Sequence, residues 1–159
     1  MLSVTTQYAL RSLIELSRQP AGGVLLGRDL AGRAGIAKDY LAKILGTLRG
    51  AGIVSSAPGI GGGYCLARAP ETIRLIDIVR LFEGEAGLPQ CVLNGTRPCS
   101  DGDPCSAHVL WSGVRESYLD FLERTTIAAA SRAAGTKPTP SDAPRVARPD
   151  RTAKRKNQR

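Results

Sequence analysis

The chain has no hydrophobic run long enough to span a bilayer, because a membrane-crossing helix needs about 20 mostly apolar residues in a row. Its first residues also lack the charged stretch and apolar core of a secretory signal, so we expect a cytoplasmic protein with no membrane partner. The cytosol keeps thiols reduced. The four cysteines are therefore expected to be free thiols or metal ligands rather than disulfides.

Enzyme signatures are missing as well. The glycines at 61–63 are not followed by the Gly-Lys-Ser/Thr of a phosphate-binding loop, and the sequence has no nucleotide or flavin fingerprint. The only histidine, His108, shows no pairing with an Asp or Glu of the kind that hydrolysis uses. We therefore predict that the protein is not an enzyme.

Positive charge is in excess, and it is unevenly spread along the chain. The formal net charge is +8 over 159 residues. Residues 1–68 carry eight Lys or Arg and three Asp or Glu, residues 69–134 carry six and nine, and residues 135–159 carry eight and two. The basic first part suggests that one face meets a polyanion such as DNA, although an ordinary solvated surface would give a similar count.

Apolar spacing predicts a mainly α-helical chain with one small β-hairpin. Helical periodicity covers 4–18, 27–34, 38–50, 75–83 and 105–132, a short strand is expected at 24–26, and the hairpin pairs 53–56 with 64–66. Within 38–50, one apolar stripe consists of Leu41, Ile44, Leu45 and Leu48. Two short helices joined at Gly35, followed by a hairpin with a glycine-rich turn, indicate a winged helix-turn-helix.

The pattern divides the chain into four parts. These are a winged helix-turn-helix DNA-binding domain at 1–84, a cysteine-rich loop at 85–104, a long C-terminal helix at 105–134 and a basic tail at 135–159. The long helix has more apolar surface than a small domain can cover, so a partner helix is expected. The tail has almost no apolar residues and is predicted to be disordered.

The candidate DNA contacts are exposed side chains of the winged helix-turn-helix. They are Lys38, Tyr40 and Lys43 for the major groove, and Arg11, Arg49, Ser55, Ser56 and Gly59 for the phosphate backbone. For Tyr40, packing against the first helix is an equally good interpretation.

Three cysteines and the histidine form a candidate metal site. Cys91, Cys99 and Cys105 are separated by seven and five residues, and His108 follows Cys105 by three positions. An Asp-Pro pair before Cys105 predicts a helix start there, which would place Cys105 and His108 on one face. Three thiolates and an imidazole suit either tetrahedral zinc or an iron–sulfur cluster, and three metal-free thiols are a further alternative. Cys65, in the returning strand, is predicted to be a packed residue rather than a ligand.

With these features in place, the sequence resembles the IscR, NsrR and RirA group of Rrf-type winged-helix regulators. The similarity spans roughly residues 1–131. It is carried by the ordered segments 7–13, 39–41, 48–56, 61–64, 77–80, 83–84, 108–111 and 125–127, together with the three cysteines of the loop. Each segment alone is a weak signal, but the ordered set is specific.

The resemblance implies a homodimer, joined through the long C-terminal helices. Dimer symmetry then predicts a palindromic operator on double-stranded DNA, and we expect the protein to act there as a repressor. The resemblance also implies an iron–sulfur cluster that reports redox state, nitric oxide or iron–sulfur supply. Cys91, Cys99, Cys105 and His108 match the ligand set of IscR-like members, which favours [2Fe-2S] over [4Fe-4S]. NsrR-like members use an acidic residue of the first helix as the fourth ligand, where this chain has Gln7.

The chain departs from its relatives at two positions. Pro58 stands where many members place a wing arginine, and Ala42 stands where IscR has an acidic residue in the recognition helix. The operator sequence is therefore not transferred from the family. Two alternatives stay open, a winged-helix regulator with structural zinc or no metal, and a small iron–sulfur redox protein.

Overall fold

The computed structural model describes residues 2–20, 22–59, 62–88, 102, 104 and 106–133. In chain order the elements are α1 Val4–Ser17, α2 Gly27–Ala34, α3 Lys38–Gly50, β1 Val54–Ala57, β2 Gly63–Leu66, the 3₁₀ helix η1 Pro70–Thr72, α4 Leu75–Glu83, the 3₁₀ helix η2 Glu85–Gly87, α5 His108–Arg124 and α6 Ile127–Ala133. The predicted class, mainly helical with one hairpin, is confirmed.

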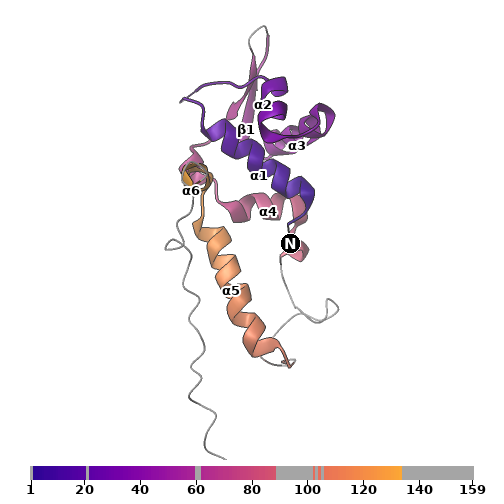
Figure 1. Cartoon of the computed structure of the whole chain (residues 1–159), viewed down its shortest axis with the longest axis vertical. Helices are drawn as coiled ribbons and strands as arrows, with labels where there is room; N and C mark the ends of the chain where they lie inside the picture. The colour runs from indigo at the N-terminus through magenta and orange to yellow at the C-terminus, as the bar shows by residue number, and fades with distance from the viewer. Residues whose placement is uncertain are drawn as a thin grey trace, which may run out of the picture.

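Helix α1 is the centre of the fold. It begins after Ser3, whose hydroxyl oxygen accepts a hydrogen bond from the Thr6 backbone amide at 3.2 Å, as a helix N-cap does. Its inner face buries Ala9, Leu13 and Leu16. Helices α2, α3, α4 and α6 all pack against it, with α2 and α3 on one side and α4 on the other (Figure 1).

Helices α2 and α3 form the predicted helix-turn-helix. Helix α2 ends at Gly35, whose φ of 67° lies in the left-handed region that glycine adopts without strain. The predicted apolar stripe of α3 is confirmed, because Leu41, Ile44, Leu45 and Leu48 are all buried. Burial of that stripe turns the opposite face of α3 outward.

Strands β1 and β2 form an antiparallel hairpin, the wing, with a register from Val54 opposite Leu66 to Ala57 opposite Gly63. The strand expected at 24–26 is reduced to a single bridge, in which Leu25 and Tyr64 exchange two backbone hydrogen bonds of 2.9 Å. A Cβ on Gly63 would lie 2.4 Å from the Leu25 carbonyl oxygen. Glycine is therefore required for the two backbones to approach.

The single helix predicted over 105–132 is instead two helices, α5 and α6. The segment between them is extended because it pairs with the start of α4. Leu75 N–H donates to the Thr125 carbonyl at 2.9 Å, and Ile127 N–H donates to the Ile73 carbonyl at 2.9 Å. The predicted helix start is also displaced, since Ser106 and Ala107 form a turn and α5 begins at His108.

Helix α5 points away from the α1–α4 assembly, whereas α6 turns back and lies beside α1 (Figure 1). Ile127 and Ala128 of α6 are buried against that assembly. Among the described helices, none combines the length and the apolar character needed to cross a membrane.

Candidate nucleic-acid interface and cysteine segment

Three cations of the helix-turn-helix are available to a ligand. Arg33 lies in the last turn of α2, and Lys38 and Lys43 lie on the outer face of α3, all three exposed. Within the described part of the chain, none of the three forms an ion pair. Sequence reasoning identified both lysines but missed Arg33, which the helical period of 27–34 could have placed beside them.

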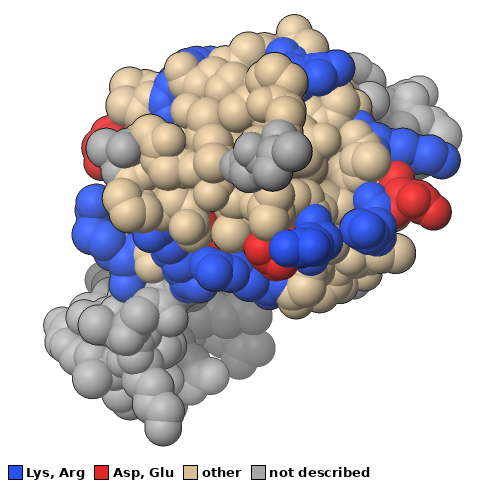
Figure 2. All heavy atoms as spheres, turned by 90° about the horizontal axis from the view of Figure 1, so that it is seen from above, with Lys and Arg blue, Asp and Glu red and all other residues tan. Residues whose placement is uncertain are grey.

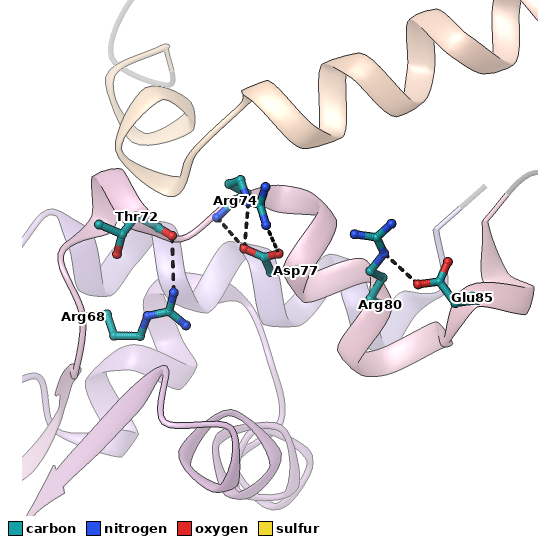
Figure 3. Close-up of polar contacts among 6 residues, drawn as sticks. All are labelled: Arg68, Thr72, Arg74, Asp77, Arg80 and Glu85. Carbon is teal, nitrogen blue, oxygen red and sulfur yellow. Dashed lines mark hydrogen bonds and ion pairs between the residues drawn. The ribbon is translucent and has the colours of Figure 1, made fainter.

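Arginines farther along the chain are occupied differently. Arg74 binds Asp77 through Nη2 to Oδ1 at 3.0 Å, and Arg80 binds Glu85 through Nε to Oε1 at 2.8 Å (Figure 3). Arg68 lies 3.5 Å from the Thr72 carbonyl oxygen, to which it donates a hydrogen bond. These contacts hold residues near the start and end of α4, whereas Arg33, Lys38 and Lys43 form no ion pair among the described residues.

The end of the molecule that carries α2, α3 and the wing has an uneven charge distribution. Lys and Arg side chains gather along one rim with few Asp or Glu among them, and most of the other described surface on this face carries no charged side chain (Figure 2). A rim of positive charge beside a projecting hairpin suits a surface that meets two strands of phosphate.

Tyr40 lies between α3 and α1. Its hydroxyl is hydrogen-bonded to the Thr5 hydroxyl, and its ring meets Tyr8 edge-on, with 5.9 Å between ring centroids. The Arg11 guanidinium lies over the Tyr8 ring, 5.8 Å from its centroid. Tyr40 thus has the packing role that the sequence left open, and with 37% of its surface exposed it can also touch a ligand.

In the wing, the two predicted serines are held in different ways. The Ser55 hydroxyl lies 3.0 Å from Cys65 Sγ across the hairpin, so that both side chains serve the contact between the strands. Ser56 is exposed, and its hydroxyl accepts a hydrogen bond from the Arg49 guanidinium at 3.3 Å. Gly59 has a φ of 98°, which favours glycine at this position. Arg49 and Ser56 therefore form one polar group at the base of the wing.

Of the four candidate metal ligands, His108 alone lies within the described residues. Cys91, Cys99 and Cys105 lie outside the described residues, whereas His108 is 8% exposed at the start of α5. The donor set, three thiols and a buried imidazole, is chemically suited to an iron–sulfur cluster or to zinc. Gln7, the counterpart of the acidic ligand in some relatives, donates its side-chain amide to the Leu2 carbonyl at 2.9 Å.

Comparison with known proteins gives consistent results. The sequence profile of the Rrf2 family, described as iron-dependent transcriptional regulators, matches residues 2–132. The HTH-type transcriptional regulator IscR of Erwinia tasmaniensis is 30% identical over 122 residues, which cover 77% of this chain and 73% of that protein.

Two solved structures share the fold. CymR of B. subtilis, a global cysteine regulator, superposes with a TM-score of 0.69 at 26% identity, covering 86% of this chain and 98% of that one. IscR of T. potens superposes with a TM-score of 0.66 at 26% identity, covering 87% and 93%.

Proposed function

The chain belongs to the Rrf2 family of transcription regulators, and from this premise we propose that α3 and the wing bind operator DNA and that an iron–sulfur cluster controls the binding. A regulator of this family binds DNA and is not an enzyme. The observation that carries the proposed binding mode is the set of exposed, unpaired cations on α2 and α3, namely Arg33, Lys38 and Lys43.

In the proposed complex, the outer face of α3 enters the major groove. Lys38 and Lys43 then meet guanine edges or phosphates, and the exposed part of Tyr40 contacts a phosphate or a thymine methyl. Arg11 lies on the Tyr8 side of that face and contacts the adjoining phosphates. The buried stripe of α3 supports this orientation because it fixes which side of the helix faces outward.

The wing supplies contacts that do not depend on base sequence. Arg49 and Ser56 together offer a cation and a hydroxyl to one phosphate. Gly59 allows its backbone to approach a second phosphate without a side chain between them. Ser55 contributes least, because its hydroxyl is engaged with Cys65. Pro58 brings no charge, so the wing positions the protein rather than reading a base.

Two copies of the chain are expected to form a homodimer through α5. Leu110, Val114 and Phe121 lie on one line along α5 and are 76%, 57% and 54% exposed. A contiguous exposed apolar line of this kind favours pairing with an identical helix. Dimer symmetry then predicts a palindromic operator whose half-sites are about 34–36 Å apart or a multiple of that distance. Binding at a promoter would repress transcription by blocking access to it.

Cys91, Cys99, Cys105 and His108 are the proposed cluster ligands, with [2Fe-2S] favoured because Gln7 already donates its amide to the chain and is a poor ligand. A cluster bound there would supply one-electron redox chemistry and a site for nitric oxide. The protein's own contribution is the buried imidazole of His108, the first residue of α5.

The binding mode is tested with Lys43→Ala and an operator obtained by selecting random duplexes on the wild-type protein. We expect the operator affinity, measured by fluorescence anisotropy, to fall about fivefold or more. Arg124→Ala is the matched control, since it also removes one positive charge but lies at the end of α5. Equal affinity of Lys43→Ala and wild type would show that α3 does not lie in the groove as proposed.

The cluster is tested by anaerobic purification. A visible spectrum with a reduced-state paramagnetic signal that is lost in Cys99→Ser supports it, and in vitro transcription with and without the cluster tests repression. A colourless protein that contains one zinc per chain would contradict the cluster and indicate structural zinc instead.

A further inference from the structure

Glu83, the last residue of α4, reaches across the fold to the beginning of α1. Its Oε1 accepts a hydrogen bond from the Ser3 backbone N–H at 2.7 Å, although the two residues are 80 positions apart. The Thr6 hydroxyl, buried at 0% exposure, is hydrogen-bonded to the Ser3 hydroxyl at 3.0 Å. The first turn of α1 is therefore fixed by a residue of α4.

This contact supplies a charge that α1 lacks. The N-terminus of a helix carries exposed N–H groups and a partial positive charge, which an acidic side chain in the first turn usually balances. Helix α1 has no acidic residue in its first turn. The Glu83 carboxylate takes that place from outside the helix. Burial alone would raise the pKa of Glu83, but hydrogen bonds from Thr6 and Ser3, together with the positive chain terminus, outweigh it and hold that pKa below its ordinary value.

The 3₁₀ helix η2 passes close to the Glu83 side chain. A Cβ on Gly87 would lie 2.3 Å from Glu83 Cβ and 3.0 Å from Glu83 Oε2. The first of these distances is shorter than real Cβ contacts allow, so the Glu83 side chain would have to move if residue 87 had a side chain. Glycine at 87 thus allows η2 to pass directly over Glu83.

The same turn of α1 also contacts the helix proposed to read DNA. Thr5, the neighbour of Thr6, bonds through its hydroxyl to the Tyr40 hydroxyl of α3. One turn farther along α1, Tyr8 meets the Tyr40 ring edge-on. Tyr40 is the third residue of α3, so these contacts fix the N-terminal end of the helix proposed to lie in the major groove.

We propose that Glu83 is a positioning residue for operator binding, which it supports by fixing the first turn of α1 and, through Thr5, the orientation of Tyr40 and α3. The inference rests on the proposed function, because it assumes that α3 reads the operator. Glu83 itself does not touch DNA. Its loss should therefore lower specific affinity and leave the charge-driven affinity for random duplexes unchanged.

The test is a double-variant cycle in the full-length protein, with operator and random-duplex affinities measured by fluorescence anisotropy. Glu83→Ala and Thr5→Val each break one end of the connection, and we expect each to lower operator affinity about fivefold while random-duplex affinity stays at the wild-type level. Because both act through one turn, the double variant should be about as weak as the weaker single variant. Losses that multiply would overturn the proposal, since distant, independent sites behave that way.

Two further variants separate positioning from a general effect on folding. Glu83→Gln keeps an acceptor oxygen for Ser3 and should recover most of the operator affinity that Glu83→Ala loses. Glu15→Ala removes a carboxylate from the other end of α1, where Glu15 is paired with Arg18, and should bind the operator like wild type. If Glu83→Gln is as weak as Glu83→Ala, the hydrogen bond does not position α3.

Circular dichroism shows whether Glu83→Ala folds. If it does not, Gly87→Ala tests the positioning role of Glu83 instead. It leaves the carboxylate in the chain and displaces it, so operator affinity should again fall without a change in random-duplex affinity. Operator affinity equal to wild type in Gly87→Ala would overturn the inference. The proposed function fails separately, if the wild-type protein itself does not prefer its selected operator over random duplexes.

Discussion

Single residues in this chain often act on elements far from them in sequence, and Glu83 is the strongest example. Its carboxylate bonds to Ser3, which starts α1, and the charge also reaches α5, since burial and then the Glu83 charge raise the pKa of Tyr118 above its ordinary value. The Glu83 carboxylate of α4 therefore interacts with residues at the start of α1 and within α5.

The lowered pKa of Glu83 predicts how stability depends on pH. A carboxyl whose folded-state pKa lies below its unfolded value stabilises the fold above the unfolded value, 4.5, and loses that contribution as pH falls through the folded value. The wild-type protein should therefore have a higher melting temperature than Glu83→Gln at neutral pH. The difference between the two melting temperatures should shrink as the pH falls below 4.5. Melting curves of both proteins by circular dichroism measure this. A difference that stays constant down to pH of about 3 would mean that folding does not favour the anion.

Among the elements, local pattern predicted some features and missed others for a clear reason. The stripe of α3 and the glycine stop of α2 depend on spacing within one helix, so the sequence was sufficient. The break between α5 and α6 depends on pairing of Thr125 and Ile127 with the start of α4, which no pattern in 105–132 reveals.

The candidate interface divides in the same way. The exposure of Lys38 and Lys43 follows from the helical period, and both were predicted from it. The inward turns of Tyr40 and Ser55 depend on Thr5 and Cys65, which belong to other elements. The sequence left the packing of Tyr40 against α1 open as one of two interpretations and gave no sign of the Ser55–Cys65 contact.

Helix α5 carries the prediction that belongs to the element scale. Its exposed line of Leu110, Val114 and Phe121 would be buried in a dimer, so Val114→Glu should place a charge in that interface and shift the protein to monomer. Sedimentation velocity reports the change in mass. Val109→Glu is the matched control, because Val109 is 83% exposed on the same helix but about 140° around it from Val114. A dimer that survives Val114→Glu would locate the interface elsewhere.

At the scale of the whole molecule, His108 and the helix proposed to read DNA are linked by contacts that run through α4. His108 begins α5, whose other end is clamped to the start of α4, and α4 ends at Glu83 on the first turn of α1. The segment with Cys91 and Cys99 follows η2 in the chain, and η2 passes over Glu83. The described elements on either side of the cysteine segment, η2 and α5, both pack against α4.

Charge outside this frame gives the last prediction. Residues 135–159 carry eight Lys or Arg against two Asp or Glu, and no described element extends beyond Ala133. Each cation that contacts a phosphate steepens the fall of log affinity with log salt by about 0.9, without regard to base sequence. A chain ending at residue 134 should therefore bind DNA more weakly at low salt and show a shallower salt dependence. Its preference for operator over random duplex should stay constant or rise, because the removed contacts serve both duplexes equally. Anisotropy titrations at several salt concentrations measure both quantities, and an unchanged slope would show that the tail does not contact DNA.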